Sequence, residues 1–282
     1  MTLMLRFLAR CPLWLLHLWG SAIGWVVYAA SPTYRKRLRA NAARAGVSQC
    51  QVMESIAQAG KMVLELPYLW LRPDSDRLEG RVVQWSGREH VEAALAAGRG
   101  IVFLTPHLGC FEVTAQAYAE AFGARSPVTV LYRPARQKAL REVVEASRSR
   151  AGLKTAPATM AGVRQMIRAL KSGEVVGMLP DQVPPQGLGV WAPFFGQSAY
   201  TMTLAARLAQ QTGAAVLLAW GERLPWGRGY RVHFEPLTES LGQPDDLAQS
   251  ATVINRAMER LIMRCPQQYL WGYHRYKQPR DL

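Results

Sequence analysis

A histidine and a glutamate five positions apart in the segment TPHLGCFE form the clearest candidate for a chemical site in this sequence. His107 follows the apolar run at 101–105, and Glu112 falls where a helix is expected to begin just beyond Gly109. Five positions on one helix would separate two side chains by about 140°, so direct pairing needs His107 in the loop before the helix. From there Glu112 can orient the imidazole as a base that takes a proton from a hydroxyl. The spacing equally permits a solvated histidine and a first-turn glutamate that the helix dipole favours.

The elements around this pair predict a mixed, largely buried sheet flanked by helices, which is an α/β fold. From about residue 82, short apolar runs alternate with helical patterns, as is typical of α/β domains. Strands are predicted at 101–105, 128–132, 175–179, 214–220 and 230–234, and helices at 110–122, 136–151, 160–172, 198–212 and 247–264. An earlier helical pattern that includes Met53 is predicted to end at Pro67.

Asp181 and Gln182 follow a predicted strand, as His107 does. Open α/β sheets bind their ligands at the carboxyl ends of strands. These three residues are therefore expected to face one crevice. The sequence leaves open whether Asp181 and Gln182 contact substrate or scaffold a loop.

The N-terminal segment predicts a membrane-associated helix. Between Arg10 and Arg35 lie 24 residues without a formal charge, and about 20 helical residues span a hydrocarbon core of roughly 30 Å. The segment could cross a bilayer or lie in its surface. A cleaved signal peptide and a buried helix of a soluble protein are the alternatives, and the cluster RKRLR that follows argues against export. Residues 1–45 are predicted to form an anchor with a basic flank, and residues 46–282 the α/β domain.

Composition excludes a disordered basic chain and leaves three kinds of partner. The 282 residues hold 34 Lys and Arg against 20 Asp and Glu, a net charge of +14, but 49% of them are hydrophobic. Nucleic acid, anionic lipid and an acidic protein could all use such a charge. The four cysteines contain no C-x-x-C pair, so neither a metal site nor a disulfide framework is predicted.

Further sequence blocks give the H-x4-E motif a family context. They are Tyr132-Arg133-Pro134, Asp181-Gln182, the segment 193–196 (PFFG) and the segment 270–277 (LWGYHRYK). With these blocks in this order over residues 10–280, the chain resembles the late acyltransferases of lipid A biosynthesis, within the glycerolipid acyltransferase superfamily. The resemblance implies acyl transfer from an acyl-acyl carrier protein to a hydroxyl of a lipid A precursor, at the cytoplasmic face of the bacterial inner membrane. It implies no cofactor.

The resemblance also implies roles for individual residues. His107 would deprotonate the acceptor hydroxyl, Glu112 would support this base, and no acyl-enzyme would form. Arg133 matches the arginine block and could hold a phosphate or the developing oxyanion. Cys110, beside the base, is interpreted as a packing residue and not as a nucleophile.

The helix predicted at 160–172 carries Arg164, Arg168 and Lys171 on one outer face. This basic face could dock the acidic carrier protein or simply be solvated. Two other functions stay open: a related acyltransferase with a lysophospholipid, glycolipid or aminolipid acceptor, and a non-catalytic basic protein that binds membranes or nucleic acid. The basic C-terminal segment lacks any nucleic-acid motif, so no nucleic-acid partner is expected.

Overall fold

The computed structural model describes residues 2–73, 76–78, 80–132 and 150–281, and its centre is a seven-stranded sheet in the order β1-β9-β8-β2-β5-β3-β4. Five of the six neighbouring pairs are parallel, and β8 and β9 are antiparallel. The predicted mixed α/β sheet is therefore confirmed. A separate antiparallel hairpin is formed by β6 and β7.

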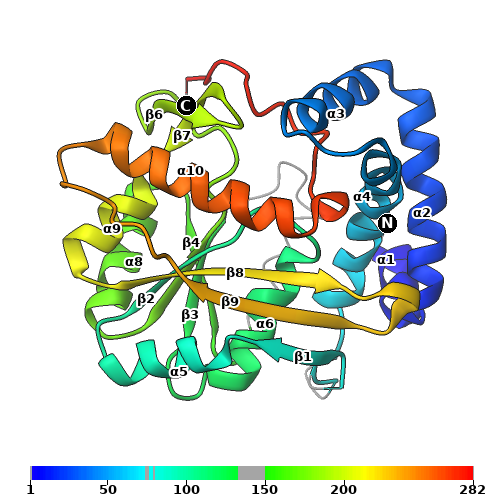
Figure 1. Cartoon of the computed structure of the whole chain (residues 1–282). Coiled ribbons are helices and arrows are strands. Elements are labelled where there is room, and N and C mark those ends of the chain that lie inside the picture. Colours follow the sequence, from blue (N-terminus) through cyan, green and yellow to red (C-terminus); the bar gives the residue numbers. More distant parts are fainter. Residues whose placement is uncertain (1, 74–75, 79, 133–149, 282) are drawn as a thin grey trace.

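The elements follow one another along the chain with mostly short connections (Figure 1). The strands are β1 Val82–Ser86, β2 Ile101–Leu104, β3 Val128–Tyr132, β4 Leu153–Pro157, β5 Val175–Met178, β6 Gly189–Phe194, β7 Gln197–Met202, β8 Ala215–Arg223 and β9 Tyr230–Pro236. The described helices are α1 Thr2–Arg10, α2 Leu13–Ala30, α3 Pro32–Arg44, α4 Gln49–Trp70, α5 Arg88–Ala97, α6 Phe111–Phe122, α8 Met160–Lys171, α9 Leu204–Thr212 and α10 Leu247–Arg264, with the 3-10 turns η1 Pro225–Gly227 and η2 Pro266–Gln268.

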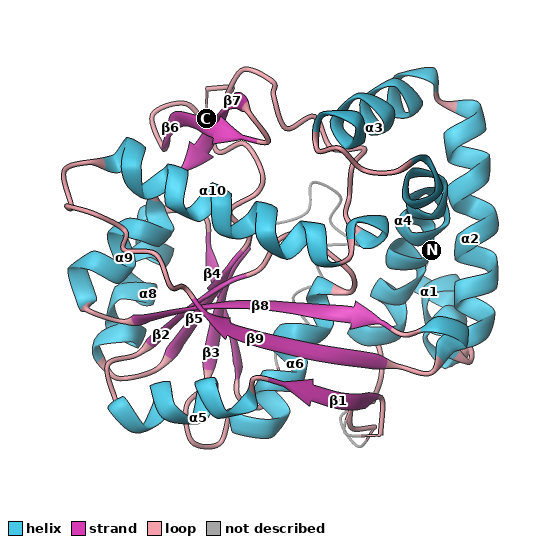
Figure 2. Ribbon diagram, in the orientation of Figure 1, coloured by secondary structure: helices cyan, strands magenta, loops and turns pink. Residues whose placement is uncertain are grey.

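Strand β2 shows why the sheet is buried on both faces. All four of its residues are buried, and successive side chains of a strand point to opposite faces. Val102 and Leu104 pack into a core with α8, α9 and α10, whereas Ile101 and Phe103 pack into a second core with α5 and α6. Figure 2 shows α10 and α5 on opposite sides of the strands. A central strand of this kind holds whatever follows its carboxyl end in a fixed place.

Helices α1 to α4 gather at one end of the molecule, where the tip of the β8–β9 hairpin reaches them (Figure 1). The prediction that Pro67 ends its helix is wrong, because α4 continues to Trp70. Pro67 lacks only its own N–H donor, and its carbonyl still accepts a hydrogen bond from Leu71 N–H. The division at residue 45 stays a prediction.

All five predicted strands are present, as are the helices at 110–122, 160–172 and 247–264. The helix predicted over 198–212 is wrong in its first part, where residues 197–202 form β7 and pair with β6. A tight turn at Phe195 and Gly196, both with positive φ, returns the chain into this hairpin, and the helix begins only at Leu204. Most of the helix predicted at 136–151 lies outside the described residues.

Candidate active site

The loop from Thr105 to Cys110, here called the histidine loop, joins β2 to α6 at the carboxyl edge of the sheet. Its first residue extends the strand pairing, because Thr105 N–H donates to the Met178 carbonyl of β5 at 3.1 Å. Its last residues are held by β8, where Cys110 N–H donates to the Gly221 carbonyl at 2.8 Å. The two strands that flank β2 therefore hold the histidine loop in place. His107 lies in this loop, as the sequence predicts.

Gly109 makes the sharp exit from this loop possible. Its φ is +60°, and a Cβ at this position would lie 2.1 Å from the Gly221 carbonyl oxygen. Only glycine combines this left-handed backbone with so close an approach. The turn lets α6 begin immediately at Phe111, with Glu112 in its first turn.

The partner of the His107 ring is Asp181, which follows β5. The distance from His107 Nδ1 to Asp181 Oδ1 is 2.8 Å, and the backbone N–H of His107 donates to Asp181 Oδ2 at 2.9 Å. Burial raises the pKa of the Asp181 carboxyl, but the His107 ring and these hydrogen bonds lower it more, and the resulting pKa is below the usual value. A charged Asp181 therefore fixes the Nδ1–H tautomer of His107 and leaves Nε2 as the acceptor.

Gln182 lies at the other ring nitrogen. Its Nε2 is 3.0 Å from His107 Nε2, which fits an amide N–H donated to the imidazole lone pair. The imidazole side chain is 17% exposed, whereas the Asp181 side chain is 1% exposed. The pair is therefore buried on its carboxylate side and partly exposed on its imidazole side, where a substrate that displaces the Gln182 amide would reach Nε2.

Glu112 is buried in the first turn of α6. The structure gives Asp181 as the Nδ1 partner of His107, the position that the sequence interpretation assigned to Glu112. The catalytic role of Glu112 stays a prediction.

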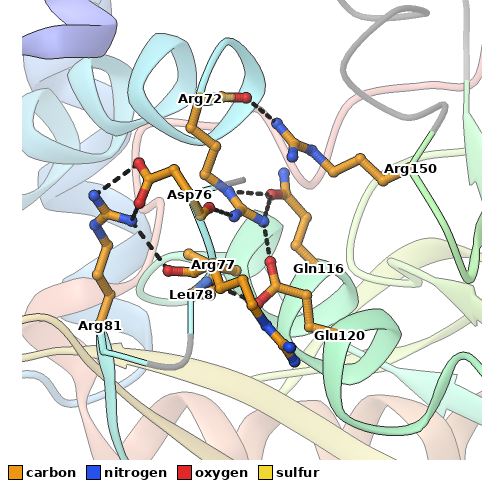
Figure 3. A network of polar contacts seen from close by, with 8 residues as sticks. All are labelled: Arg72, Asp76, Arg77, Leu78, Arg81, Gln116, Glu120 and Arg150. Carbon is orange, nitrogen blue, oxygen red and sulfur yellow. Dashed lines mark hydrogen bonds and ion pairs between the residues drawn. The ribbon is translucent and has the colours of Figure 1, made fainter. Parts of the chain in front are cut away.

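The far end of α6 is fixed by the polar network of Figure 3. Arg72, just after α4, donates to Gln116 and Glu120 of α6, at 3.1 Å and 2.5 Å from its Nη2 atom. Glu120 also accepts from the Leu78 N–H at 2.7 Å. These bonds tie α6 to the segment between α4 and β1. The helix that carries Glu112 is thereby held at both ends.

Cys110 is buried, and burial raises the pKa of its thiol well above the usual value. Thiolates and not thiols are nucleophiles, so this thiol is unsuited to forming an acyl-enzyme. The interpretation of Cys110 as a packing residue agrees with this environment.

The segment Tyr269–Tyr276, near the C-terminus, covers the histidine loop. Leu270 N–H donates to the His107 carbonyl at 3.2 Å. Tyr273 Oη accepts from the Val183 N–H at 3.0 Å, just beyond Gln182. Asn41 of α3 donates to two carbonyls of this segment, those of Trp271 and Tyr273, at 2.7 Å and 2.8 Å. The sequence block at 270–277 therefore supports the loop after β5.

The remaining predicted residues lie elsewhere. Arg133 falls outside the described residues. Arg164, Arg168 and Lys171 are exposed on α8, as predicted. Arg164 and Arg168 line an open groove of about 480 Å³, together with Ala161 and Ile167. The role of this groove stays a prediction.

The sequence interpretation missed the bond between His107 and Asp181. Both residues follow apolar strands, which the sequence shows. That the two strands are neighbours depends on the strand order, in which β5 lies beside β2 although two strands separate them in the chain. Only the sheet topology brings residues 74 positions apart to hydrogen-bonding distance.

Fold and site together define a mostly parallel α/β enzyme with a histidine–aspartate pair at the carboxyl edge of its sheet. Residues 1–278 match the family described as bacterial lipid A biosynthesis acyltransferase, and the chain belongs to this family of acyltransferases. The chain is 29% identical over 230 residues to the lipid A biosynthesis lauroyltransferase of Escherichia coli, with 80% of this chain and 71% of the relative covered. It is 30% identical, with the same coverage, to the lipid A biosynthesis palmitoleoyltransferase of that organism. A phosphatidylinositol mannoside acyltransferase of Mycobacterium tuberculosis is 27% identical over 242 residues, with 74% of each chain covered.

Proposed function

We propose that this acyltransferase moves a fatty acyl chain from acyl-acyl carrier protein to a hydroxyl of a lipid A precursor, with His107 as the general base. The observation that carries the proposal is the partly exposed His107 ring, held through Nδ1 by buried Asp181 and paired at Nε2 with the neutral Gln182 amide. General-base assistance of this kind contributes about 10²–10⁴-fold to a rate.

The acceptor hydroxyl takes the position of the Gln182 amide and donates its hydrogen bond to His107 Nε2. As this proton passes to Nε2, the hydroxyl oxygen attacks the thioester carbonyl carbon and a new C–O bond forms. Collapse of the tetrahedral intermediate breaks the C–S bond, and the imidazolium returns the proton to the leaving thiolate. The products are an ester and the free carrier thiol, and the reaction needs no resident cofactor. Asp181 stabilises the imidazolium between the two proton transfers.

The acidic carrier protein is proposed to dock on the outer face of α8. Arg164 and Arg168 border the groove there, and Ile167 contributes an apolar surface between them. Lys171 extends the same basic face at the end of the helix. Complementary charge of this kind raises association rates and fixes orientation.

The site of action is proposed to be the cytoplasmic face of the inner membrane. Among the described residues, α2 is the single helix long and apolar enough to cross a bilayer. The basic cluster RKRLR at 35–39 follows this helix directly. The anionic lipids of the cytoplasmic leaflet attract basic clusters of this kind.

The full chain, purified in detergent, tests this function. It is incubated with acyl-acyl carrier protein and a lipid A precursor that lacks secondary acyl chains, and the lipid is analysed by mass spectrometry. A mass increase of one acyl group on the lipid A precursor supports the proposal. Product on phosphatidylinositol mannoside but none on the lipid A precursor would contradict it and would favour a glycolipid acceptor. That outcome is the second candidate because a relative named for that acceptor also aligns over 74% of the chain.

A further inference from the structure

Helix α2 has two faces with different surroundings. Its buried face packs into the protein with Leu13, Leu16, His17, Gly20, Gly24 and Tyr28. The remaining face, here called the outer face, exposes large apolar side chains: Trp14, Leu18, Trp19, Ile23, Trp25, Val26 and Val27. Leu18 and Val26 are 61% and 66% exposed. An apolar surface of this extent indicates a partner outside the chain.

The buried face is joined to α4 too closely for lipid to enter between them. A Cβ on Gly60 of α4 would lie 1.9 Å from the Gly20 carbonyl oxygen, and a Cβ on Gly24 would lie 2.2 Å from the Ile56 carbonyl oxygen. Gly20 and Gly24, which form a G-x-x-x-G pair in the sequence, are therefore used within the chain, against α4. They are not available to pair α2 with another copy.

A buried ion network pins the middle of α2 to the catalytic domain. His17 Nε2 is 2.7 Å from Glu65 Oε1 of α4, and Arg223 of β8 binds both Glu65 oxygens at 2.6 Å. The His17, Glu65 and Arg223 side chains are 7%, 0% and 1% exposed. Swinging α2 away would leave the Glu65–Arg223 pair facing lipid, which is costly for charges.

The first turn of α2 and Tyr34 of α3, the helix that follows, also touch the catalytic domain. At the first turn, a Cβ on Gly227 in the β8–β9 tip would lie 2.4 Å from the backbone nitrogen of Trp14. Beyond the last turn, a Cβ on Gly272 would lie 2.0 Å from the Tyr34 ring. The domain therefore runs beside the whole helix, about 27 Å for its 18 residues. Crossing a bilayer would draw this polar domain, with its β8–β9 hairpin, into hydrocarbon.

Trp226 extends the outer face from the catalytic domain. It forms the β8–β9 tip between Pro225 and Gly227, has a φ of +60° and is 88% exposed. An indole held outward in a backbone conformation that bulky residues avoid has no packing role in the protein. The neighbouring helix α1 exposes Met4 and Phe7 at 58% and 60%.

We propose that the outer face of α2, the exposed residues of α1 and the indole of Trp226 form one surface that rests in a single leaflet of an anionic bilayer, with the α2 axis in the membrane plane. Exposed basic side chains at both ends of this surface face the headgroups: Arg6, Arg10, Lys36, Arg37 and Arg228. Apolar burial combined with attraction to anionic lipid is the physics of helices that lie in an interface. The proposal rests on the proposed membrane location of the enzyme and specifies its mode.

Depth measurement separates an in-plane helix from a spanning one. Ile23→Cys and Ala30→Cys, each in a Cys50→Ser background that removes the exposed thiol, are labelled with a bimane and reconstituted in phosphatidylethanolamine–phosphatidylglycerol vesicles containing brominated lipids. The two positions share one helix face. An in-plane helix gives equal quenching depths. A spanning helix places Ile23 near the centre and Ala30 about 10 Å shallower, and that result would overturn the proposal.

Vesicle flotation tests the Trp226 contact. Trp226→Ala is expected to weaken partition into the same vesicles about tenfold, the equivalent of losing one interfacial side chain. Trp191→Ala is the matched control, because Trp191 is 43% exposed on β6, at the opposite end of the molecule from α2 (Figure 1). Equal partition of both variants overturns the Trp226 contact. A concentration-dependent dimer in detergent that Val26→Lys dissociates would instead assign the outer face to a second copy.

Acyl transfer by both tryptophan variants is measured in mixed micelles, where no bilayer is needed. Turnover within twofold of the unmodified chain is expected, since neither indole lies in the described site. If the unmodified chain binds vesicles as proposed but transfers no acyl group, the proposed function fails and the membrane surface stands.

Discussion

Two of the histidine–carboxylate pairs in the described part of the protein have bonds of similar length but differ in their surroundings. His107–Asp181 and His17–Glu65 join ring nitrogen to carboxylate at 2.8 Å and 2.7 Å. Glu65 is also neutralised by Arg223, and the whole cluster is closed to solvent. Asp181 is buried, but its histidine keeps a partly exposed ring, whose Nε2 is paired with the neutral Gln182 amide. One pair therefore holds helices and a strand together, whereas the other can exchange a proton with a substrate.

The two pairs are connected through the histidine loop. Arg223 Nη2 donates to the Gly109 carbonyl at 3.2 Å, two residues after His107. Gln268 binds both the N–H and the carbonyl of Arg223, each at 2.9 Å. The closed network of His17, Glu65 and Arg223 therefore helps to hold the loop that carries the open pair, His107 and Asp181. Variants that separate stability from turnover test this division of roles.

The largest effect is expected for His107→Ala. Loss of the base lowers kcat/KM by about 10²–10⁴-fold, measured as acyl transfer to the lipid A precursor. The thermal midpoint should also fall, because the variant leaves the buried Asp181 carboxylate without its ring partner. Near-normal turnover of a purified, folded His107→Ala protein would contradict the proposed base.

Arg223→Met is expected to act on stability. It leaves the Glu65 charge buried with His17 alone, and breaking a buried pair in this way costs about 3–5 kcal/mol. Denaturant unfolding in detergent measures the change. The double variant Glu65→Leu/Arg223→Met removes both charges and should regain most of the lost stability. A double variant as unstable as the single one would show that the network is not an isolated charge pair.

Acid should weaken the closed network. Burial raises the pKa of Glu65, but Arg223 and His17 lower it more, to about 2 from a usual value of 4.5. A depressed carboxyl pKa gives stability that is complete above the unfolded value and is lost as the pH falls toward the folded value. The loss between about pH 5 and pH 2 is up to roughly 3 kcal/mol. Thermal midpoints across this range measure it, and Glu65→Gln should give a flatter curve from a lower starting point.

Asp181→Asn sharpens the assignment within the open pair. An amide can present N–H to Nδ1 and favour the wrong tautomer, so kcat is expected to fall on the order of 10²-fold. Glu112→Gln is the matched comparison and should lower kcat much less. The opposite pattern would return the orienting role to Glu112.

Much of the fold was predictable because its signals are local. Strands β2, β3, β5 and β8 consist mainly of apolar residues, since both faces of the sheet are covered, whereas β9 alternates apolar and polar residues. Strand β4, with Lys154 exposed and Leu153 buried, lacks such a run and was not predicted. The sequence predicts a helix where β7 lies. The pairing of β7 with β6 depends on the turn between the two strands and not on the composition of β7 itself.

The candidate site shows the same limit. His107 at a strand end was predicted, whereas its bond to Asp181 required the strand order. Hydrogen bonds between distant residues leave no periodic mark in a sequence, and neither does the closed network that joins residues 17, 65 and 223.

The sequence by itself determined the family, the α/β class, the histidine that could act as a base and an apolar helix of membrane length. These depend on residue type and short-range spacing. The tertiary structure decided which carboxylate binds His107, and that α2 is fixed to the catalytic domain along its length. The composition of a helix determines how favourably the helix enters hydrocarbon. Its contacts with the rest of the protein determine which other segments would have to enter with it.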